Sequence, residues 1–237
     1  MNRQTVIPIG IEDDASLECF YSKRNQPLIE QLKNLLAGAR AKRVLYLWGE
    51  SGSGKTHLLN ACCRAAGKSG RQNLYVSLKQ HGGQHGGRLE QLSDVHKDTL
   101  VCIDDLQQIV GCAPGQNQIF SLYEKIMNGA GMNGAGAIVV SGTSPLGSIG
   151  ITLKDLESRL SSGGVFNIYA LDDDEKRTAL KLTATKRGFA LDDGVVQFIM
   201  SHYQRDTKSL FALLDKLDRG SLQAHRKITI PFVKTLM

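Results

Sequence analysis

The stretch RVLYLWGESGSGKTH (43–57) joins an apolar run to a glycine-rich loop and then to a helix-forming segment. Gly49 and Gly54 bracket four residues and are followed by Lys55 and Thr56, which is the spacing of a phosphate-binding loop. Glycine lets the backbone turn its N–H groups toward an anion, and the following helix N-terminus adds partial positive charge. The sequence therefore predicts a nucleotide site. The residues predicted to line it are Gly49, Glu50, Ser51, Gly52, Ser53, Gly54, Lys55, Thr56 and His57.

Two side chains of this loop have predicted roles of their own. Lys55 is expected to reach the outer phosphates, and the Thr56 hydroxyl is expected to ligate Mg²⁺. The alternative is a glycine-rich loop with no ligand, which the spacing and the strand-to-helix context disfavour. The expected cofactors are ADP or ATP with Mg²⁺.

Five short apolar runs alternate with longer helical patterns along the chain. Because the runs are nearly continuous rather than alternating, they indicate strands that are covered on both faces. With the helical stretches between them they predict an α/β fold with a parallel, doubly wound sheet. The predicted strands are RVLYLWG (43–49), NLYVSLK (73–79), TLVCIDDL (99–106), AIVVSG (137–142) and VFNIYAL (165–171).

The pattern changes after Leu171. Three segments begin with acidic residues suited to a helix N-terminus and continue with helical apolar spacing, so residues 172–237 are predicted to form a small all-helical lid domain. The expected organisation is an N-terminal tail at 1–19, a nucleotide-binding domain at 20–171 and the lid at 172–237.

Two adjacent carboxylates follow the third apolar run. Asp104 and Asp105 are predicted to stand at the carboxyl edge of the sheet, where open α/β folds bind ligands. Asp104 is expected to hold the Mg²⁺ shell from Thr56, and Asp105 to orient an attacking water. The alternative is an acidic turn with no catalytic role, which is common after strands.

The composition argues against a membrane-spanning or a secreted disulfide-rich protein, but it does not identify a function. The net charge of +6 and pI near 9.1 allow contact with nucleic acid or an acidic protein. No run approaches the ~20 apolar residues of a membrane span, and no signal segment follows Met1, so a soluble cytoplasmic protein is expected. The five cysteines have neither metal-ligand spacing nor the density of a secreted disulfide scaffold, which suits a reducing compartment.

Two glycine-rich stretches, HGGQHGG (81–87) and NGAGMNGAGA (128–137), contain small repeats. His81 and His85 have no nearby Cys or carboxylate partner, so both stretches are expected to be surface loops without metal chemistry.

Taken together, four motifs resemble the AAA+ ATPases of the DnaA group, and within that group the family of regulatory inactivators of DnaA. The motifs are LYLWGESGSGKTHLLNA (45–61), LVCIDDLQ (100–107), DLESRLSSG (155–163) and LFALLDKLDRGSLQAHRKITIPFVK (210–234). The resemblance covers nearly the whole chain, and its RKITIPFVK ending separates these inactivators from DnaA itself.

The resemblance implies roles for four further residues. Arg159 resembles the arginine finger, which reaches the nucleotide of a neighbouring subunit and stabilises charge on the transferring phosphoryl group; the alternative is a solvated helix residue. Lys208 stands where the family carries the sensor-two arginine, and Arg205 one turn earlier could share that role. Thr143 stands near the sensor-one position, where relatives carry Asp.

At the N-terminus the resemblance implies a sliding-clamp-binding motif, in which a glutamine precedes apolar residues that fill a pocket. The alternative is that this segment packs on its own core as an edge strand. The motif residues are Gln4, Val6, Ile7, Pro8 and Ile9. Thr5 replaces a common leucine and no aromatic residue follows, so weak clamp binding is expected.

The resemblance implies a regulator that, with the DNA-loaded sliding clamp of DNA polymerase III, stimulates ATP hydrolysis by DnaA and so prevents repeated initiation of replication. DnaA and the clamp would be its partners, and DNA would be contacted through the clamp; the sequence leaves the choice between monomer and homodimer open. Asp105 is one methylene shorter than the glutamate of strong AAA+ motors, so at most weak intrinsic ATPase activity is expected. The alternatives are a DnaA-like initiator or helicase loader acting on DNA, which would need a helix-turn-helix that we do not find, and a stand-alone ATPase motor.

Overall fold

The computed structural model describes residues 15–20, 22–38, 42–79, 92, 95–128, 136–224 and 228–236. The chain divides into two compact units. One contains the sheet and ends at Tyr169, and the other contains 170–237 together with the short segments 18–23 and 52–54. The clamp-motif residues Gln4 to Ile9, the histidines His81 and His85, and most of the second glycine-rich stretch lie outside the described residues.

The first unit is built on one parallel sheet, which confirms the predicted fold class. Each predicted apolar run overlaps one strand, and only β5 begins before its run, by one residue: β1 (Val44–Trp48), β2 (Asn73–Ser77), β3 (Leu100–Asp104), β4 (Ala137–Gly142) and β5 (Gly164–Asn167). The strand order is β2-β3-β4-β1-β5, and every neighbouring pair is parallel. The phosphate-loop strand β1 is therefore separated from the acidic strand β3 by β4.

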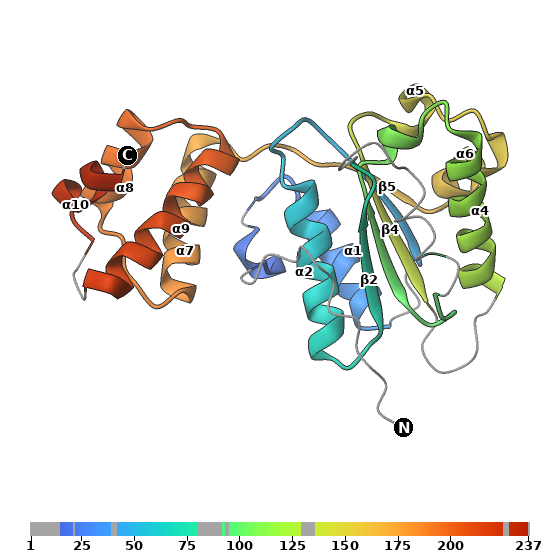
Figure 1. Cartoon of the computed structure of the whole chain (residues 1–237), viewed down its shortest axis with the longest axis horizontal. Helices are drawn as coiled ribbons and strands as arrows, with labels where there is room; N and C mark the ends of the chain where they lie inside the picture. The colour runs from blue at the N-terminus through green and yellow to red at the C-terminus, as the bar shows by residue number, and fades with distance from the viewer. Residues whose placement is uncertain are drawn as a thin grey trace. The chain divides into compact units, whose positions relative to one another are not determined.

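Helices cover both faces of this sheet, as parallel strands require. Figure 1 shows α1 (Gln26–Leu36) and α2 (Lys55–Lys68) on one side, and α4 (Ala113–Asn128) and α6 (Lys154–Ser162) on the other. The shorter elements are η1 (Leu17–Cys19), η3 (Leu106–Ile109) and α5 (Leu146–Ile149).

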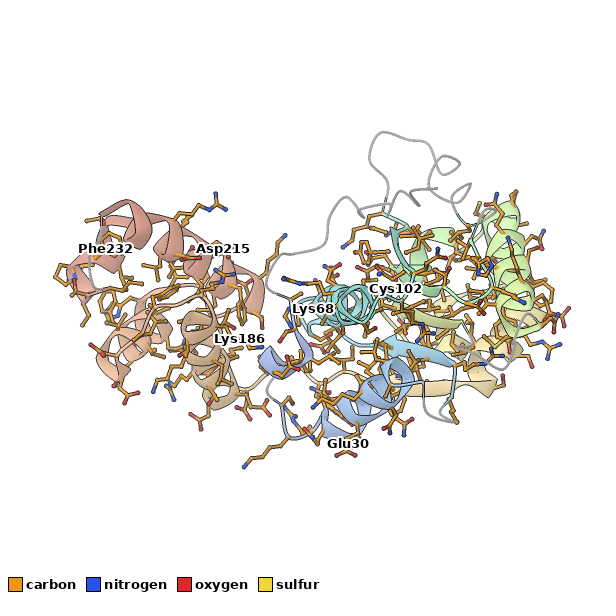
Figure 2. The ribbon with its side chains drawn as sticks, turned by 90° about the horizontal axis from the view of Figure 1, so that it is seen from below. Glu30, Lys68, Cys102, Lys186, Asp215 and Phe232 are labelled. Carbon is orange, nitrogen blue, oxygen red and sulfur yellow. The ribbon has the colours of Figure 1, made fainter. Side chains whose placement is uncertain are left out.

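Strand alternation decides which side chains face which layer. In β3, Val101 and Ile103 belong to the hydrophobic cluster that also contains side chains of α4 and α6. Leu100, Cys102 and Asp104 alternate with them and so point to the opposite face, where α2 packs. Figure 2 shows Cys102 among the packed side chains of this unit.

The described residues of the lid form four helices, α7 (Asp173–Lys186), α8 (Asp193–His202), α9 (Thr207–Ala224) and α10 (Ile230–Leu236). The predicted acidic start of α7 caps that helix: the Asp172 carboxylate accepts the Glu175 N–H (2.8 Å) and Glu175 accepts the Asp172 N–H (3.1 Å), which is a reciprocal capping box. Leucines such as Leu213 and Leu217 are fully buried between the helices.

An ion pair and a close apolar contact also join the lid helices to one another. Asp215 of α9, labelled in Figure 2, pairs with Arg187 after α7 at 2.6 Å. Phe232 of α10 packs close to Gly220 of α9, where a larger side chain would press on its ring. The lid therefore has a core of its own.

Within the described residues, no helix is both long and apolar enough to cross a membrane. In the same part of the chain, no group of three or more His, Cys, Asp and Glu side chains gathers as metal ligands. Cys62, Cys63 and Cys102 are buried free thiols, and burial raises the pKa of Cys62.

Candidate functional site

The glycine-rich loop leaves β1 at Trp48 and enters α2 at Lys55. Gly52 and Gly54 have φ angles of +79° and +99°, which glycine adopts without strain. A Cβ atom at Gly54 would overlap the Phe20 ring, so this position also needs the smallest side chain. The sequence pattern and the backbone therefore agree on a tight loop.

Lys55 is buried at the start of α2, although a lysine ammonium is normally solvated. Its Nζ donates to the carbonyl oxygens of Gly49 and Glu50, both at 2.7 Å. Burial lowers the pKa of Lys55, and the nearby carboxylates of Asp104 and Asp105 partly oppose that shift. A cation is thus held inside the curve of the loop.

Asp104 lies at the end of β3, 2% exposed, and three hydroxyl groups donate to it. Its Oδ2 accepts from Thr56 Oγ1 at 2.7 Å and from the Tyr75 hydroxyl at 2.9 Å, and its Oδ1 accepts from Ser141. Burial and the neighbouring Asp104 raise the pKa of Tyr75, so Tyr75 stays a donor. The structure brings together Thr56 and Asp104, the two residues predicted to hold Mg²⁺.

Asp105 has a different environment from Asp104. It is the one non-glycine residue with positive φ among the described residues, at 66°, and its backbone N–H donates to Ser141 Oγ at 3.0 Å. Its side chain accepts from Gln107 Nε2 at 2.8 Å and pairs with Lys79 Nζ at 3.2 Å. The carboxylate predicted to orient water thus has one hydrogen-bonded oxygen, Oδ1, whereas Oδ2 is buried, lies beside Lys79 and accepts no hydrogen bond within the described residues. Its backbone conformation costs free energy outside glycine.

Ser141 links the two aspartates, and the sequence reasoning missed it. It is fully buried at the end of β4 and contacts Asp104 through its hydroxyl hydrogen and Asp105 through its oxygen. The available signal was a single polar residue at the carboxyl end of an otherwise apolar strand, AIVVSG. Tyr75, in the middle of β2, and Lys79, two residues after β2 ends, were also not predicted, because no pattern in the sequence distinguishes them from other polar residues of a strand segment.

The loop and the sheet edge fit a nucleotide phosphate chain with Mg²⁺. The Ser53 hydroxyl is buried and has no hydrogen-bond partner within the described residues, so it is an uncompensated donor in the curve of the loop. Thr56 and Asp104 supply the hard oxygen donors that Mg²⁺ prefers. Lys55 supplies a buried positive charge beside them.

His57 follows Thr56 in the first turn of α2. Its Nε2 lies 3.1 Å from the carbonyl oxygen of Ser16, so the ring joins the loop helix to the segment that precedes η1. His57 was predicted to line the nucleotide site; its ring contacts the protein backbone, and its role toward nucleotide stays a prediction. Glu50 and Ser51 are exposed at the rim of the loop.

Arg159 lies on α6 with 54% of its side chain exposed. Its Nε is 3.5 Å from Glu124 Oε1, and its guanidinium lies 5.9 Å from the centroid of the Tyr123 ring. The structure thus places the predicted finger on the surface of the sheet unit, against α4.

Thr143, predicted near the sensor-one position, is exposed just after β4. The Tyr46 hydroxyl donates to the carbonyl oxygen of Ser144 at 2.6 Å, which fixes the backbone beside it. The hydroxyl that reaches the aspartates belongs to Ser141, two residues earlier. The role of Thr143 stays a prediction.

The two cations predicted to sense nucleotide from the lid both lie near the start of α9. Arg205 pairs with Asp173 of α7 at 3.3 Å, and Lys208 is exposed on the first turn of α9. The Ser209 N–H donates to Asp206 Oδ1 at 2.9 Å, and hydrogen bonding from Ser209 lowers the pKa of Asp206; this contact caps the N-terminus of the helix. The role of Arg205 and Lys208 in binding nucleotide stays a prediction.

Comparison with known proteins adds three findings. Residues 173–237 match the family described as "Hda, lid domain". A Haemophilus influenzae protein described only as uncharacterized is 36% identical over 237 residues, which are all of this chain and 99% of that protein. The structure resembles domain III of the Thermotoga maritima replication initiation protein DnaA, with a TM-score of 0.73, 16% identity, and coverage of 96% of this chain and 97% of that one.

Two further solved structures share the fold. Aquifex aeolicus DnaA, solved with bound AMPPCP, has a TM-score of 0.67 at 18% identity and is matched over 90% of this chain and 68% of its own. The Thermotoga maritima RuvB branch migration motor has a TM-score of 0.64 at 16% identity, over 94% of this chain and 71% of that one. At these identities the likeness concerns the fold alone.

Proposed function

Because this chain belongs to the Hda-like, DnaA-related AAA+ proteins, we propose that it is a nucleotide-binding regulator that acts on the initiator DnaA. Together with the DNA-loaded sliding clamp, it stimulates ATP hydrolysis by DnaA and thereby limits the initiation of DNA replication. The match of residues 173–237 to the Hda lid is the observation that carries this proposal, since it separates the chain from other proteins that share the fold.

The residues of the loop and the sheet edge have distinct roles in binding ADP or ATP. Lys55 holds the outer phosphates by charge, and the Ser53 hydroxyl and the loop N–H groups donate to their oxygens. Thr56 and Asp104 hold Mg²⁺, which when bound neutralises phosphate charge. Lys208 and Arg205 contact the phosphates from the lid.

Asp105 makes the intrinsic reaction slow. Its side chain is one methylene shorter than the glutamate of strong AAA+ motors, its Oδ1 accepts from Gln107, and the Lys79 ammonium 3.2 Å from Oδ2 makes the carboxylate a weaker base toward water. The nucleotide, ADP in the working form, therefore serves mainly to hold the protein in the shape that binds DnaA. Hydrolysis takes place on DnaA, where Arg159 stabilises the charge of the transferring phosphoryl group.

The test is ATP hydrolysis by DnaA measured with this protein, the sliding clamp and DNA, omitting each component in turn. We expect full stimulation only when all are present. Rapid hydrolysis by this protein alone would instead identify a motor. DNA binding that needs neither clamp nor DnaA would favour an initiator or helicase loader.

The clamp contact is proposed for Gln4, Val6, Ile7, Pro8 and Ile9, and a double change tests it. Gln4→Ala with Ile7→Ala should weaken clamp binding about tenfold or more, because an apolar anchor and a hydrogen-bonding amide are both lost. The melting temperature should not change. A lowered melting temperature with unchanged clamp binding would show that the segment packs on its own core.

A further inference from the structure

Helices α4 and α6 are packed together beside the sheet (Figure 1). Ile119 and Leu122 of α4 share a hydrophobic cluster with Leu156 and Leu160 of α6, and all four are buried. Leu156 and Leu160 are one helical turn apart, so they form a single apolar stripe. Arg159 borders this stripe, which lets its aliphatic stem lie along α4 while its charged end stays in solvent.

The first turn of α6 is fixed by one buried amide. Gln116 of α4 is fully buried, and its Oε1 accepts from the Thr152 N–H at 3.1 Å and from the Leu153 N–H at 2.9 Å. Its Nε2 donates to the Ile109 carbonyl oxygen at 3.1 Å, so Gln116 itself cannot turn. The register of α6 against α4 is therefore set before Arg159 is reached.

About two turns further along α4, two side chains contact the Arg159 guanidinium. Glu124 Oε1 lies 3.5 Å from Arg159 Nε, and 34% of the Glu124 side chain is exposed. The guanidinium carbon of Arg159 lies over the Tyr123 ring, 5.9 Å from its centroid, and Tyr123 is itself 8% exposed, so its ring is held by the core. Within the described residues, the ion pair of Arg159 uses Nε, and its two terminal nitrogens make no ion pair or hydrogen bond.

We propose that Glu124 and Tyr123 are positioning residues for Arg159: they hold its Nε edge and one face, and leave its terminal fork to bind a phosphate of the neighbouring subunit. This inference rests on the proposed function. An arginine held in one conformation before the partner arrives loses less side-chain entropy on binding, and its fork meets the phosphate in a fixed direction. We expect this to raise the rate of stimulated ATP hydrolysis and to leave the affinity between this protein and DnaA unchanged.

The test compares full-length Glu124→Gln and Tyr123→Leu variants with Arg159→Ala in the assay with DnaA, clamp and DNA. Glu157→Gln is the matched control, because it removes the same charge from an ion pair on α6, with Lys154 at 2.8 Å. We expect Glu124→Gln to lower the maximal stimulation about fivefold, as for the loss of a well-placed exposed ion pair, without changing the half-saturating concentration. Glu157→Gln should match the unaltered protein.

A second measurement reads the position of Arg159 without any activity. The Arg159 Nε–H signal in NMR should be resolved and slow to exchange in the unaltered protein and in Glu157→Gln, and should broaden or exchange faster in Glu124→Gln and Tyr123→Leu. Identical signals and identical stimulation in all variants would overturn the inference while Arg159→Ala could still uphold the proposed function. If no stimulation is seen even with the unaltered protein, the proposed function fails, and the NMR result alone decides whether Arg159 is held.

Discussion

The proposed nucleotide site at the sheet edge and the proposed arginine finger on α6 differ in how their charged side chains are buried. Asp104 is 2% exposed and accepts from three hydroxyl groups, whereas Arg159 is 54% exposed and is held by one carboxylate and one ring. A charge that serves the chain's own ligand can be buried with its partners, which fixes it tightly. A charge that serves a neighbour's ligand must stay accessible, so it can be held only from one side. The two regions should therefore respond to mutation in separable ways.

The largest expected effect is that of Arg159→Ala, which should change only the action on DnaA and not the binding of nucleotide by this protein. We expect stimulation of DnaA to fall by about 10³-fold or more, as for other fingers supplied in trans, while nucleotide binding and clamp binding stay unchanged. Stimulated hydrolysis and calorimetry on the same preparation measure both, and Lys154→Ala on the same helix is the control. Normal stimulation by Arg159→Ala would show that Arg159 is a surface arginine with no role in the reaction on DnaA.

The reverse pattern is expected from Lys55→Ala. Losing a buried ammonium that meets the phosphates should weaken ADP and ATP binding about a hundredfold, since charged hydrogen bonds are the strong ones. Calorimetry with each nucleotide measures it. Lys68→Ala, in the exposed last turn of the same helix, should bind normally. Unchanged affinity in Lys55→Ala would remove the premise that this loop binds nucleotide.

A smaller effect on the fold itself is expected from Ser141→Ala. The change leaves a carboxylate oxygen of Asp104 and the Asp105 N–H without their shared partner, which should lower the free energy of unfolding by about 2 kcal/mol. Urea unfolding measures it. Ser148→Ala is the matched control, because that hydroxyl is exposed and should matter by less than about 0.5 kcal/mol. Equal losses in both variants would mean that the buried network adds no stability.

The sequence by itself determined the features that depend on neighbouring residues. Apolar runs predicted the five strands, the Gly49–Thr56 spacing predicted a tight loop before α2, and acidic starts predicted α7, α8 and α9, whereas α10 has no acidic start and was not predicted. These succeed because strand burial, glycine turns and helix caps act over a few residues. The pairing of Thr56 with Asp104 was also within reach, since parallel strands bring their carboxyl ends to one edge.

Only the tertiary structure decided which partners each charge has. Ser141 and Asp104 are 37 residues apart in sequence, and their contact depends on β4 lying beside β3, an order that periodicity does not encode. The left-handed backbone of Asp105 and its pairing with Lys79 follow from the same packing. Glu124 meets Arg159 because buried leucines and Gln116 set the register of α4 against α6. Sequence spacing selects the residue types, and packing between distant segments decides which of them are buried, which are paired and which remain available to a partner.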